Sequence, residues 1–136
     1  MSYLLDTNVA SELRRRVPDK RVVAWMSAQS PSLLHVSVLT FGEIGKGIAL
    51  LRSSEPKRAE ALRAWLNEMK VDFRERILAV DEQACDAWAE LAARATLPIV
   101  DGLLMGTALS RGLTLVTRDV DHPRALGVPV LNPWET

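Results

Sequence analysis

Four acidic residues stand where the chain is expected to enter or leave regular structure. Asp6 comes directly after a short apolar run at 3–5, and Asp119 lies just past another at 113–116. Glu43 lies on the helix expected after the second strand, and Asp101 in the opening turn of the last long helix. In open parallel sheets, binding sites form outside the carboxyl ends of the strands. The pattern therefore predicts that these acids share one cleft.

Carboxylates gathered in one cleft repel one another and resist ionisation. A divalent cation removes that repulsion, and an all-oxygen set of ligands suits Mg²⁺ or Mn²⁺ better than zinc. A metal site of this kind lowers the pKa of bound water, orients a phosphate and stabilises the leaving oxygen. The residue types thus indicate metal-dependent phosphodiester hydrolysis that needs no histidine base.

Each acid also has a purely structural interpretation. Glu43 stands three residues after a threonine, which is the spacing of a helix capping box. Asp101 complements a helix dipole, and Asp119 and Asp121 suit turns. Asp6 can cap a helix. Taken singly, Glu43 and Asp101 are better explained by these structural roles, so the functional interpretation rests on the four acids together and on the residues around them.

The alternation of short apolar runs with longer helical patterns predicts an α/β domain with a mostly parallel sheet. We expect strands at 3–5, 33–36, 77–80, 113–116 and 128–131. We expect helices at 10–16, 19–29, 40–51, 55–73, 82–95 and 99–111. The chain of 136 residues contains no repeat or linker and fits a single domain.

The overall charge gives no general argument for nucleic-acid binding, because 17 basic and 17 acidic residues cancel. The argument must be local. The densest basic cluster either lines the path of an RNA backbone or forms a solvated helix end, and it comprises Arg14, Arg15 and Arg16, with Lys20 and Arg21 nearby. A second basic group is better explained as a solvated helix face, and it comprises Lys57, Arg58 and Arg63.

Membrane insertion and secretion are not expected. No apolar run approaches the roughly 18 residues of a membrane span. Residues 1–6 lack the basic region and long apolar core of a signal peptide. The single cysteine, Cys85, excludes an internal disulfide. These features predict a cytoplasmic protein with no membrane partner.

The segments around the four acids resemble the motifs of the PIN-domain ribonucleases, specifically the VapC-type toxins of bacterial toxin–antitoxin pairs. The resemblance covers essentially the whole chain, with the motifs in order. The motifs are Leu4-Leu5-Asp6-Thr7-Asn8-Val9, Ser37-Val38-Leu39-Thr40-Phe41-Gly42-Glu43-Ile44-Gly45-Lys46-Gly47, Leu97-Pro98-Ile99-Val100-Asp101-Gly102-Leu103 and Leu115-Val116-Thr117-Arg118-Asp119-Val120-Asp121. One motif alone is a weak signal, whereas four in order are a strong one.

The resemblance implies a PIN-like α/β fold for residues 1–136, with helices on both faces of the sheet. It also implies a Mg²⁺- or Mn²⁺-dependent endoribonuclease that cleaves RNA by metal-activated water and is inhibited by a small cognate antitoxin. A homodimer, or a higher assembly with the antitoxin, belongs to the same expectation.

By position, the resemblance makes Asp6, Glu43, Asp101 and Asp119 the metal-binding and catalytic acids. It makes other polar residues the groups that orient water or carboxylates, and these are Thr7, Asn8 and Thr117. Arg118 lies inside the last motif, where it either contacts a phosphate or forms an ion pair that offsets the acidic cleft.

The sequence departs from the family pattern after the last motif. The family often has Asp-Phe there, whereas Asp121 is followed by His122 and Pro123. Asp121 either supports Asp119 or has lost that role. His122 is in reach of a phosphate in principle, but a lone histidine beside a proline is more often only solvated.

Two other functions remain open on the sequence alone. The first is a PIN-like domain with weak or no turnover that binds RNA or an antitoxin, and the His122-Pro123 departure is its support. The second is another metal-dependent enzyme with the same acids, such as a phosphatase or a DNA nuclease, because the same ligands serve any phosphodiester.

Overall fold

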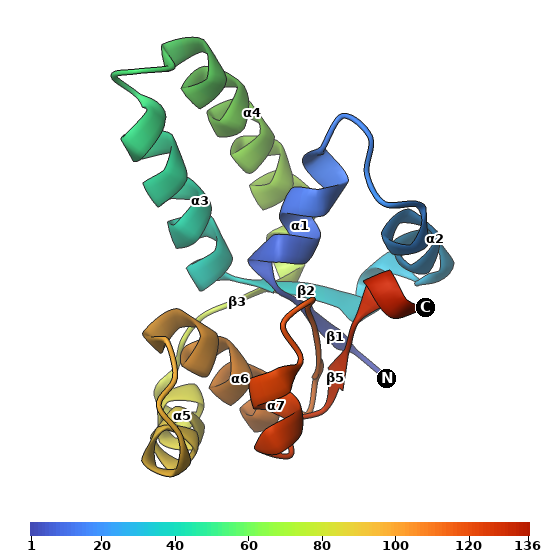
Figure 1. Ribbon diagram of the computed structural model, residues 1–136, viewed down its shortest axis with the longest axis vertical. Coiled ribbons are helices and arrows are strands. Elements are labelled where there is room, and N and C mark those ends of the chain that lie inside the picture. Colours follow the sequence, from blue (N-terminus) through green and yellow to red (C-terminus); the bar gives the residue numbers. More distant parts are fainter.

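The computed structural model describes residues 1–136, which form a five-stranded, entirely parallel sheet surrounded by helices (Figure 1). The strand order is β3-β2-β1-β4-β5. The strands are β1 (Tyr3–Leu5), β2 (Leu34–Ser37), β3 (Ile77–Leu78), β4 (Thr114–Val116) and β5 (Val130–Leu131). All five predicted strands are present, and the prediction of a mostly parallel sheet is confirmed.

All six predicted helices are present, with ends that move by three residues at most. They are α1 (Thr7–Arg14), α2 (Lys20–Ala28), α3 (Val38–Leu51), α4 (Pro56–Asp72), α5 (Glu82–Arg94) and α6 (Ile99–Arg111). A seventh, α7 (Asp121–Ala125), was not predicted, because its five residues are too few for a helical pattern to emerge. None of the helices combines the length and the apolar character that a membrane crossing requires.

Alternating side chains of the central strands build a core on each face of the sheet. Leu4 and Leu115 pack in one cluster with residues of α5 and α6. Leu5 and Val116 pack in a second cluster with residues of α1 and α2. Successive strand residues point to opposite faces, so two adjacent apolar residues in β1 and in β4 require a cover on both faces. The prediction of helices on both faces is confirmed.

Helices α3 and α4 lie side by side and project from the sheet (Figure 1, green). A third apolar cluster joins them to α1, through Ala10, Ile44, Ile48, Leu66 and Met69. Because α1 starts immediately after β1, this packing fixes α3 and α4 beside the carboxyl end of the central strand. Polar residues on the three helices can therefore border the site described below.

The beginning of α3 rules out the capping-box interpretation of Glu43. Ser37 is the N-cap residue, and its side chain accepts a hydrogen bond from the backbone N–H of Leu39. Thr40 lies inside the helix and is fully buried. The sequence interpretation was wrong because β2 runs straight into α3, with no loop between them. Glu43 therefore has no capping partner, and its side chain serves another contact.

Helices α5 and α6 approach closely at Gly106. A Cβ atom at this position would lie 2.6 Å from the carbonyl oxygen of Ala84 and 2.8 Å from the backbone nitrogen of Trp88. Both neighbours are backbone atoms of α5, which cannot turn aside as a flexible side chain can. Helix packing thus requires a glycine here. The close contact fixes α6, the helix that carries Asp101, against α5.

Gly106→Ala should destabilise the protein by about 1–3 kcal/mol or more, because it overpacks a rigid contact. Gly45→Ala is the matched control, since a Cβ there has no neighbour within 4 Å and the glycine is also helical. It should stabilise the helix by about 0.5–1 kcal/mol. Urea unfolding of both variants measures the difference, and equal midpoints would contradict the close packing of α5 on α6.

Candidate metal centre at the carboxyl edge of the sheet

The order of the strands places the candidate site at β1. From β1 the chain adds β2 and β3 on one side and later β4 and β5 on the other, so β1 is the point at which the order reverses. Ligands bind at such points in open α/β sheets. Asp6 follows β1 directly, and its backbone N–H donates to the carbonyl of Val116, 2.9 Å away. Asp119 follows β4 and lies at the same edge.

Three of the four predicted acids line one small cleft there. Asp6 comes from the end of β1, Asp119 from the loop after β4 and Asp101 from the first turn of α6. His122 of α7 and the buried Thr117 line the same cleft. The rest of its lining is apolar and consists of Leu104, Met105, Leu115 and Pro123. The prediction that these three acids converge is therefore met by the fold.

The Thr117 hydroxyl organises the polar side chains of the cleft. It donates to Oδ2 of Asp6 at 2.7 Å. It accepts from the backbone N–H of Asp119 at 3.1 Å and from Nδ2 of Asn8 at 3.2 Å. Asn8 Nδ2 also lies 3.3 Å from Oδ2 of Asp119. One buried threonine thus positions carboxylates from two different strands.

Glu43 lies beside this cleft rather than in its lining. It borders a neighbouring groove, in which Thr7 is also found. The Thr7 hydroxyl donates to Oε1 of Glu43 at 2.6 Å and lies 3.2 Å from the hydroxyl of Thr40. Since Thr7 follows Asp6 in the chain, this bond holds Glu43 next to the cleft. The expectation of four acids in one cleft is corrected to three acids with Glu43 at the side.

The electrostatics of the site oppose ionisation. Burial raises the pKa of Asp6, and repulsion from Asp101 and Glu43 raises it further, although hydrogen bonds from Thr117 and Thr7 act in the opposite direction. Partial burial also raises the pKa of Asp101, and the charges of Glu43 and Asp119 add to the effect. His122 counteracts that rise in the pKa of Asp101. The acids therefore carry unfavourable charge that a cation would neutralise.

The carboxylates are too far apart to hold one metal ion together. No group of three or more histidine, cysteine, aspartate or glutamate side chains is close enough together to hold one ion as the side chains stand. Like charges with no counter-ion repel, which keeps such side chains apart. Binding of one ion by these acids would therefore require their side chains to move closer together.

The structure places the two residues at the departure from the family pattern differently. His122 lines the cleft beside Asp101, whereas Asp121 starts α7 and is not part of the lining. The support of Asp119 comes instead from Asn8 and Thr117. The unpredicted helix α7 is the reason, because it turns the second residue of the Asp-His pair toward the cleft.

The predicted basic residues separate into distinct environments. Arg14 and Arg15 border the groove that contains Glu43. Arg16 lines neither that groove nor the cleft. The guanidinium of Arg118 stacks over Trp134, 4.9 Å from the ring centroid, and forms no ion pair with the acids. Arg58, which the sequence assigned to a solvated helix face, joins Arg14 and Arg15 in the groove. Nothing in the local sequence signalled that placement.

Comparison with known proteins agrees with this geometry. The family model described as "PIN domain" matches residues 3–127. The plasmid stability protein StbB of Pseudomonas syringae is 38% identical over 138 residues, with 97% of this chain and 98% of that protein covered. The VapC ribonuclease Y4jK of Sinorhizobium fredii is 33% identical, with 97% of both covered. The toxin FitB of Neisseria gonorrhoeae is 35% identical, with 96% and 97% covered.

Solved structures resemble the chain over nearly its full length. The crystal structure of FitAcB from Neisseria gonorrhoeae has a TM-score of 0.88 at 34% identity, covering 98% of this chain and 99% of that one. VapBC-5 of Mycobacterium tuberculosis, a member of the VapBC family of toxin–antitoxin systems, has a TM-score of 0.64 at 25% identity, covering 96% and 95%. The family match, these relatives and the acidic cleft agree: the chain belongs to the PIN-domain family and is similar to its VapC-type members.

Proposed function

We propose that this protein is a Mg²⁺- or Mn²⁺-dependent endoribonuclease that serves as the toxin of a toxin–antitoxin pair. One observation carries the proposal: Asp6, Asp101 and Asp119 line a single cleft at the point where the strand order reverses, with Glu43 beside it. The relatives named as VapC ribonuclease and as toxin support the choice of RNA as substrate.

The side chains present suit a hard divalent cation. Its candidate ligands are carboxylate oxygens, which Mg²⁺ and Mn²⁺ prefer. Burial raises the pKa values of Asp6 and Asp101, and neighbouring carboxylates raise them further, so a bound cation would favour their ionised forms. A cation held by Asp6, Glu43, Asp101 and Asp119 would supply an activated water and neutralise charge at the phosphate.

The other polar residues of the centre act on geometry. Thr117 and Asn8 hold the carboxylates of Asp6 and Asp119 in fixed directions, and Thr7 does the same for Glu43. Fixed ligands need less reorganisation when substrate binds. His122 lines the cleft, where its ring can contact a phosphate oxygen. Asp121 lies outside the lining of the cleft, so we propose no role for it.

The antitoxin partner is proposed to cover an apolar groove on the other side of α1. This groove has a volume of about 210 Å³ and is bordered by α1, α2 and α4, with eight of its ten lining residues hydrophobic. Leu13, Met26, Trp65 and Phe73 are among them. A concave apolar surface of this kind accepts an apolar segment of a partner protein, and the VapBC-5 relative belongs to a toxin–antitoxin family.

Leu13→Asp should weaken capture of the antitoxin co-expressed with this protein by about tenfold or more, because it places a charge in the apolar groove. Leu13 is already 38% exposed, so the fold should tolerate the change. Leu109→Asp is the matched control, with a helical leucine that is 37% exposed and lies outside the groove. Co-purification of both variants checks this, and equal retention of the antitoxin would rule out the groove.

Cleavage assays test the proposed activity. Purified protein is incubated with bacterial RNA and, separately, with plasmid DNA, in Mg²⁺, in Mn²⁺ and in EDTA. Asp101→Asn, purified identically, excludes a contaminating nuclease. We expect cleavage of RNA only, by wild type only, and only with metal.

The other outcomes identify the rival functions. Cleavage of DNA as well would indicate a general nuclease with the same acids. Equal cleavage by wild type and by Asp101→Asn would contradict catalysis at this cleft, and a domain that binds RNA or antitoxin without turnover would then be the better description.

A further inference from the structure

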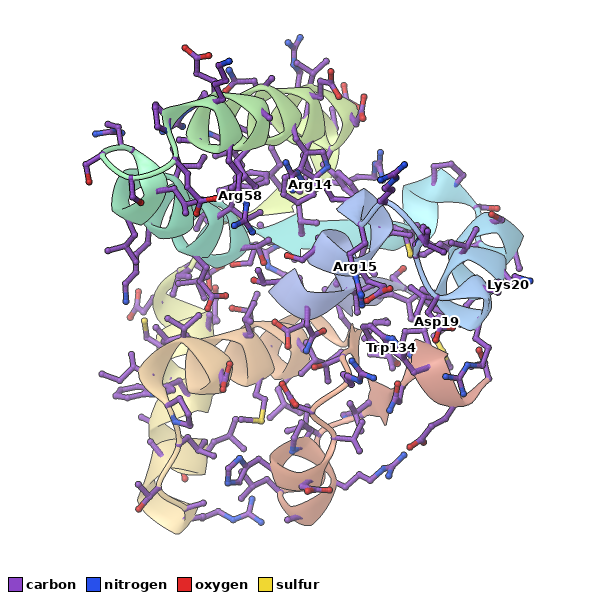
Figure 2. The ribbon with its side chains drawn as sticks, turned by 45° about the horizontal axis from the view of Figure 1, so that its top comes forward. Arg14, Arg15, Asp19, Lys20, Arg58 and Trp134 are labelled. Atoms are coloured by element: carbon purple, nitrogen blue, oxygen red, sulfur yellow. The ribbon has the colours of Figure 1, made fainter.

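A second concave surface adjoins the acidic cleft and is lined by three arginines. It has a volume of about 330 Å³ and lies between α1, α3 and α4. Arg14 and Arg15 come from α1 and its end, and Arg58 from the first turn of α4. Figure 2 shows Arg14 and Arg58 close together between α4 and α1, with Arg15 nearby, whereas Lys20 lies apart at the start of α2. We call this surface the arginine groove.

The arginine groove adjoins the acidic centre at Thr7 and Glu43. Both residues line the groove and are joined by the 2.6 Å hydrogen bond. Thr7 is adjacent in the chain to Asp6, which lines the cleft. Glu43 is the only acidic residue in the lining of the groove. A polyanion that lies along this groove therefore meets arginine side chains first and acidic side chains only from Glu43 onward.

Two of the three guanidinium groups, those of Arg14 and Arg58, are available to a ligand. Arg15 pairs with Glu12 at 3.3 Å and Arg58 with Glu55 at 3.5 Å, with arginine side chains 66% and 61% exposed. The Arg58–Glu55 pair is exposed on both sides, and such pairs contribute little to stability. Glu12 is buried, so Arg15 is held by a buried carboxylate. Arg14 has no carboxylate partner; its guanidinium lies 5.7 Å from the centroid of the Trp65 ring.

The Trp65 ring holds one arginine of the groove, Arg14, in a defined position. It is half-buried against the core of α1, α3 and α4. Stacking on an aromatic face restrains a guanidinium and leaves its N–H groups free for bidentate bonds to phosphate. The arginine groove is thus preorganised at Arg14.

We propose that the arginine groove binds the sugar–phosphate backbone of the RNA strand that flanks the scissile phosphodiester. This inference rests on the proposed function, because it assumes that the cut bond lies in the cleft. The chain as a whole carries no net charge, and the acids of the cleft repel phosphate. Backbone contacts must therefore come from a local cationic surface, and the arginine groove adjoins the cleft at Thr7 and Glu43.

Binding is measured with a 5′-labelled single-stranded RNA of about 12 nucleotides, by fluorescence anisotropy in EDTA. All proteins carry Asp101→Asn, which blocks the proposed cleavage and removes one repelling carboxylate. The test variant adds Arg14→Gln and Arg58→Gln. The matched control adds Arg52→Gln and Arg63→Gln, two exposed arginines at the C-cap of α3 and in α4 that border a different hollow.

The test variant should bind RNA about 100-fold more weakly than its parent at low salt, since each lost charge-assisted contact is worth roughly tenfold. The slope of log affinity against log salt should fall by about 1.4, at roughly 0.7 for each single-strand phosphate contact. The control should match its parent in both. Equal effects of the two double variants, or no RNA binding by the parent, would overturn the inference.

The outcome is separable from that of the proposed function. Arginine-dependent RNA binding together with a wild type that cuts no RNA would keep the arginine groove and remove the nuclease. Metal-dependent cleavage with arginine-independent binding would keep the nuclease and remove the groove. Loss of antitoxin capture by Arg14→Gln/Arg58→Gln, with unchanged RNA affinity, would assign the groove to the protein partner instead.

Discussion

Replacing Asp101 by asparagine should lower metal-dependent RNA cleavage by at least about 100-fold. Mutation of residues that merely orient a metal ligand typically costs 10–100-fold in metal affinity or activity, and a ligand itself should cost no less. Asp101 lines the cleft with Asp6 and Asp119 from a separate helix. Its loss leaves the two strand-end acids in place, so the fold should persist while the activity disappears.

The same substitution should raise the thermal stability of the metal-free protein. The pKa of Asp101 is raised in the folded state, first by burial and then by Glu43 and Asp119, so its ionised form destabilises the fold at neutral pH. Asparagine has nearly the same shape and no charge. We expect a higher Tm in EDTA for Asp101→Asn than for wild type, and a smaller rise of its Tm on addition of Mg²⁺ or Mn²⁺.

The pH dependence follows from the direction of that shift. A carboxyl whose folded pKa is raised binds protons more readily in the folded state, so stability falls as pH rises through the interval between the two pKa values. The difference in Tm between Asp101→Asn and wild type in EDTA should be largest near neutral pH. It should shrink as pH falls through the raised pKa of Asp101 and vanish below the ordinary value of 3.8.

These measurements separate a catalytic role from a structural one. A role of Asp101 in complementing the helix dipole predicts a lower Tm for asparagine at neutral pH, which is the opposite sign. Full cleavage activity in Asp101→Asn would remove it from the catalytic acids. Circular dichroism of both proteins is the control for folding.

Thr117→Val should raise the concentration of Mg²⁺ or Mn²⁺ needed for half-maximal cleavage by about 10–100-fold. The Thr117 hydroxyl donates to Asp6 and accepts from Asn8 and Asp119. Valine keeps the shape but leaves those partners unsatisfied, at a cost of about 1–3 kcal/mol. The bond donated by Thr117 lowers the pKa of Asp6. Without it the Asp6 carboxyl becomes harder to ionise, and a protonated carboxyl is a poorer metal ligand.

Two further variants distinguish positioning from simple destabilisation. Thr117→Ser keeps the hydroxyl and should retain a metal requirement near that of wild type. Thr107→Val removes another fully buried threonine hydroxyl, one that bonds only to the carbonyl of Leu103 within α6. It should leave the metal requirement unchanged. A shift of equal size in Thr107→Val would show that the effect of Thr117→Val comes from lost stability alone.

The sequence by itself determined the sheet, the main helices and the candidate acids. Adjacent apolar residues in short runs require cover on both faces, which specifies parallel strands between helices, as Leu4 and Leu5 demonstrate. Asp6 and Asp119 follow β1 and β4, which are neighbours in the sheet, and Asp101 stands in the first turn of α6. These features are local, because they depend on side-chain periodicity and on the position of a residue relative to its own element.

The tertiary structure decided what depends on the angles between elements. The short helix α7 brings His122 rather than Asp121 into the cleft. The join of β2 to α3 makes Ser37 the cap and leaves Glu43 to bond Thr7. The packing of α4 against α1 places Arg58 beside Arg14, 44 positions away in the chain. Each outcome depends on how helices pack, and a charged residue on a helix surface carries no sequence signal of the groove it will face.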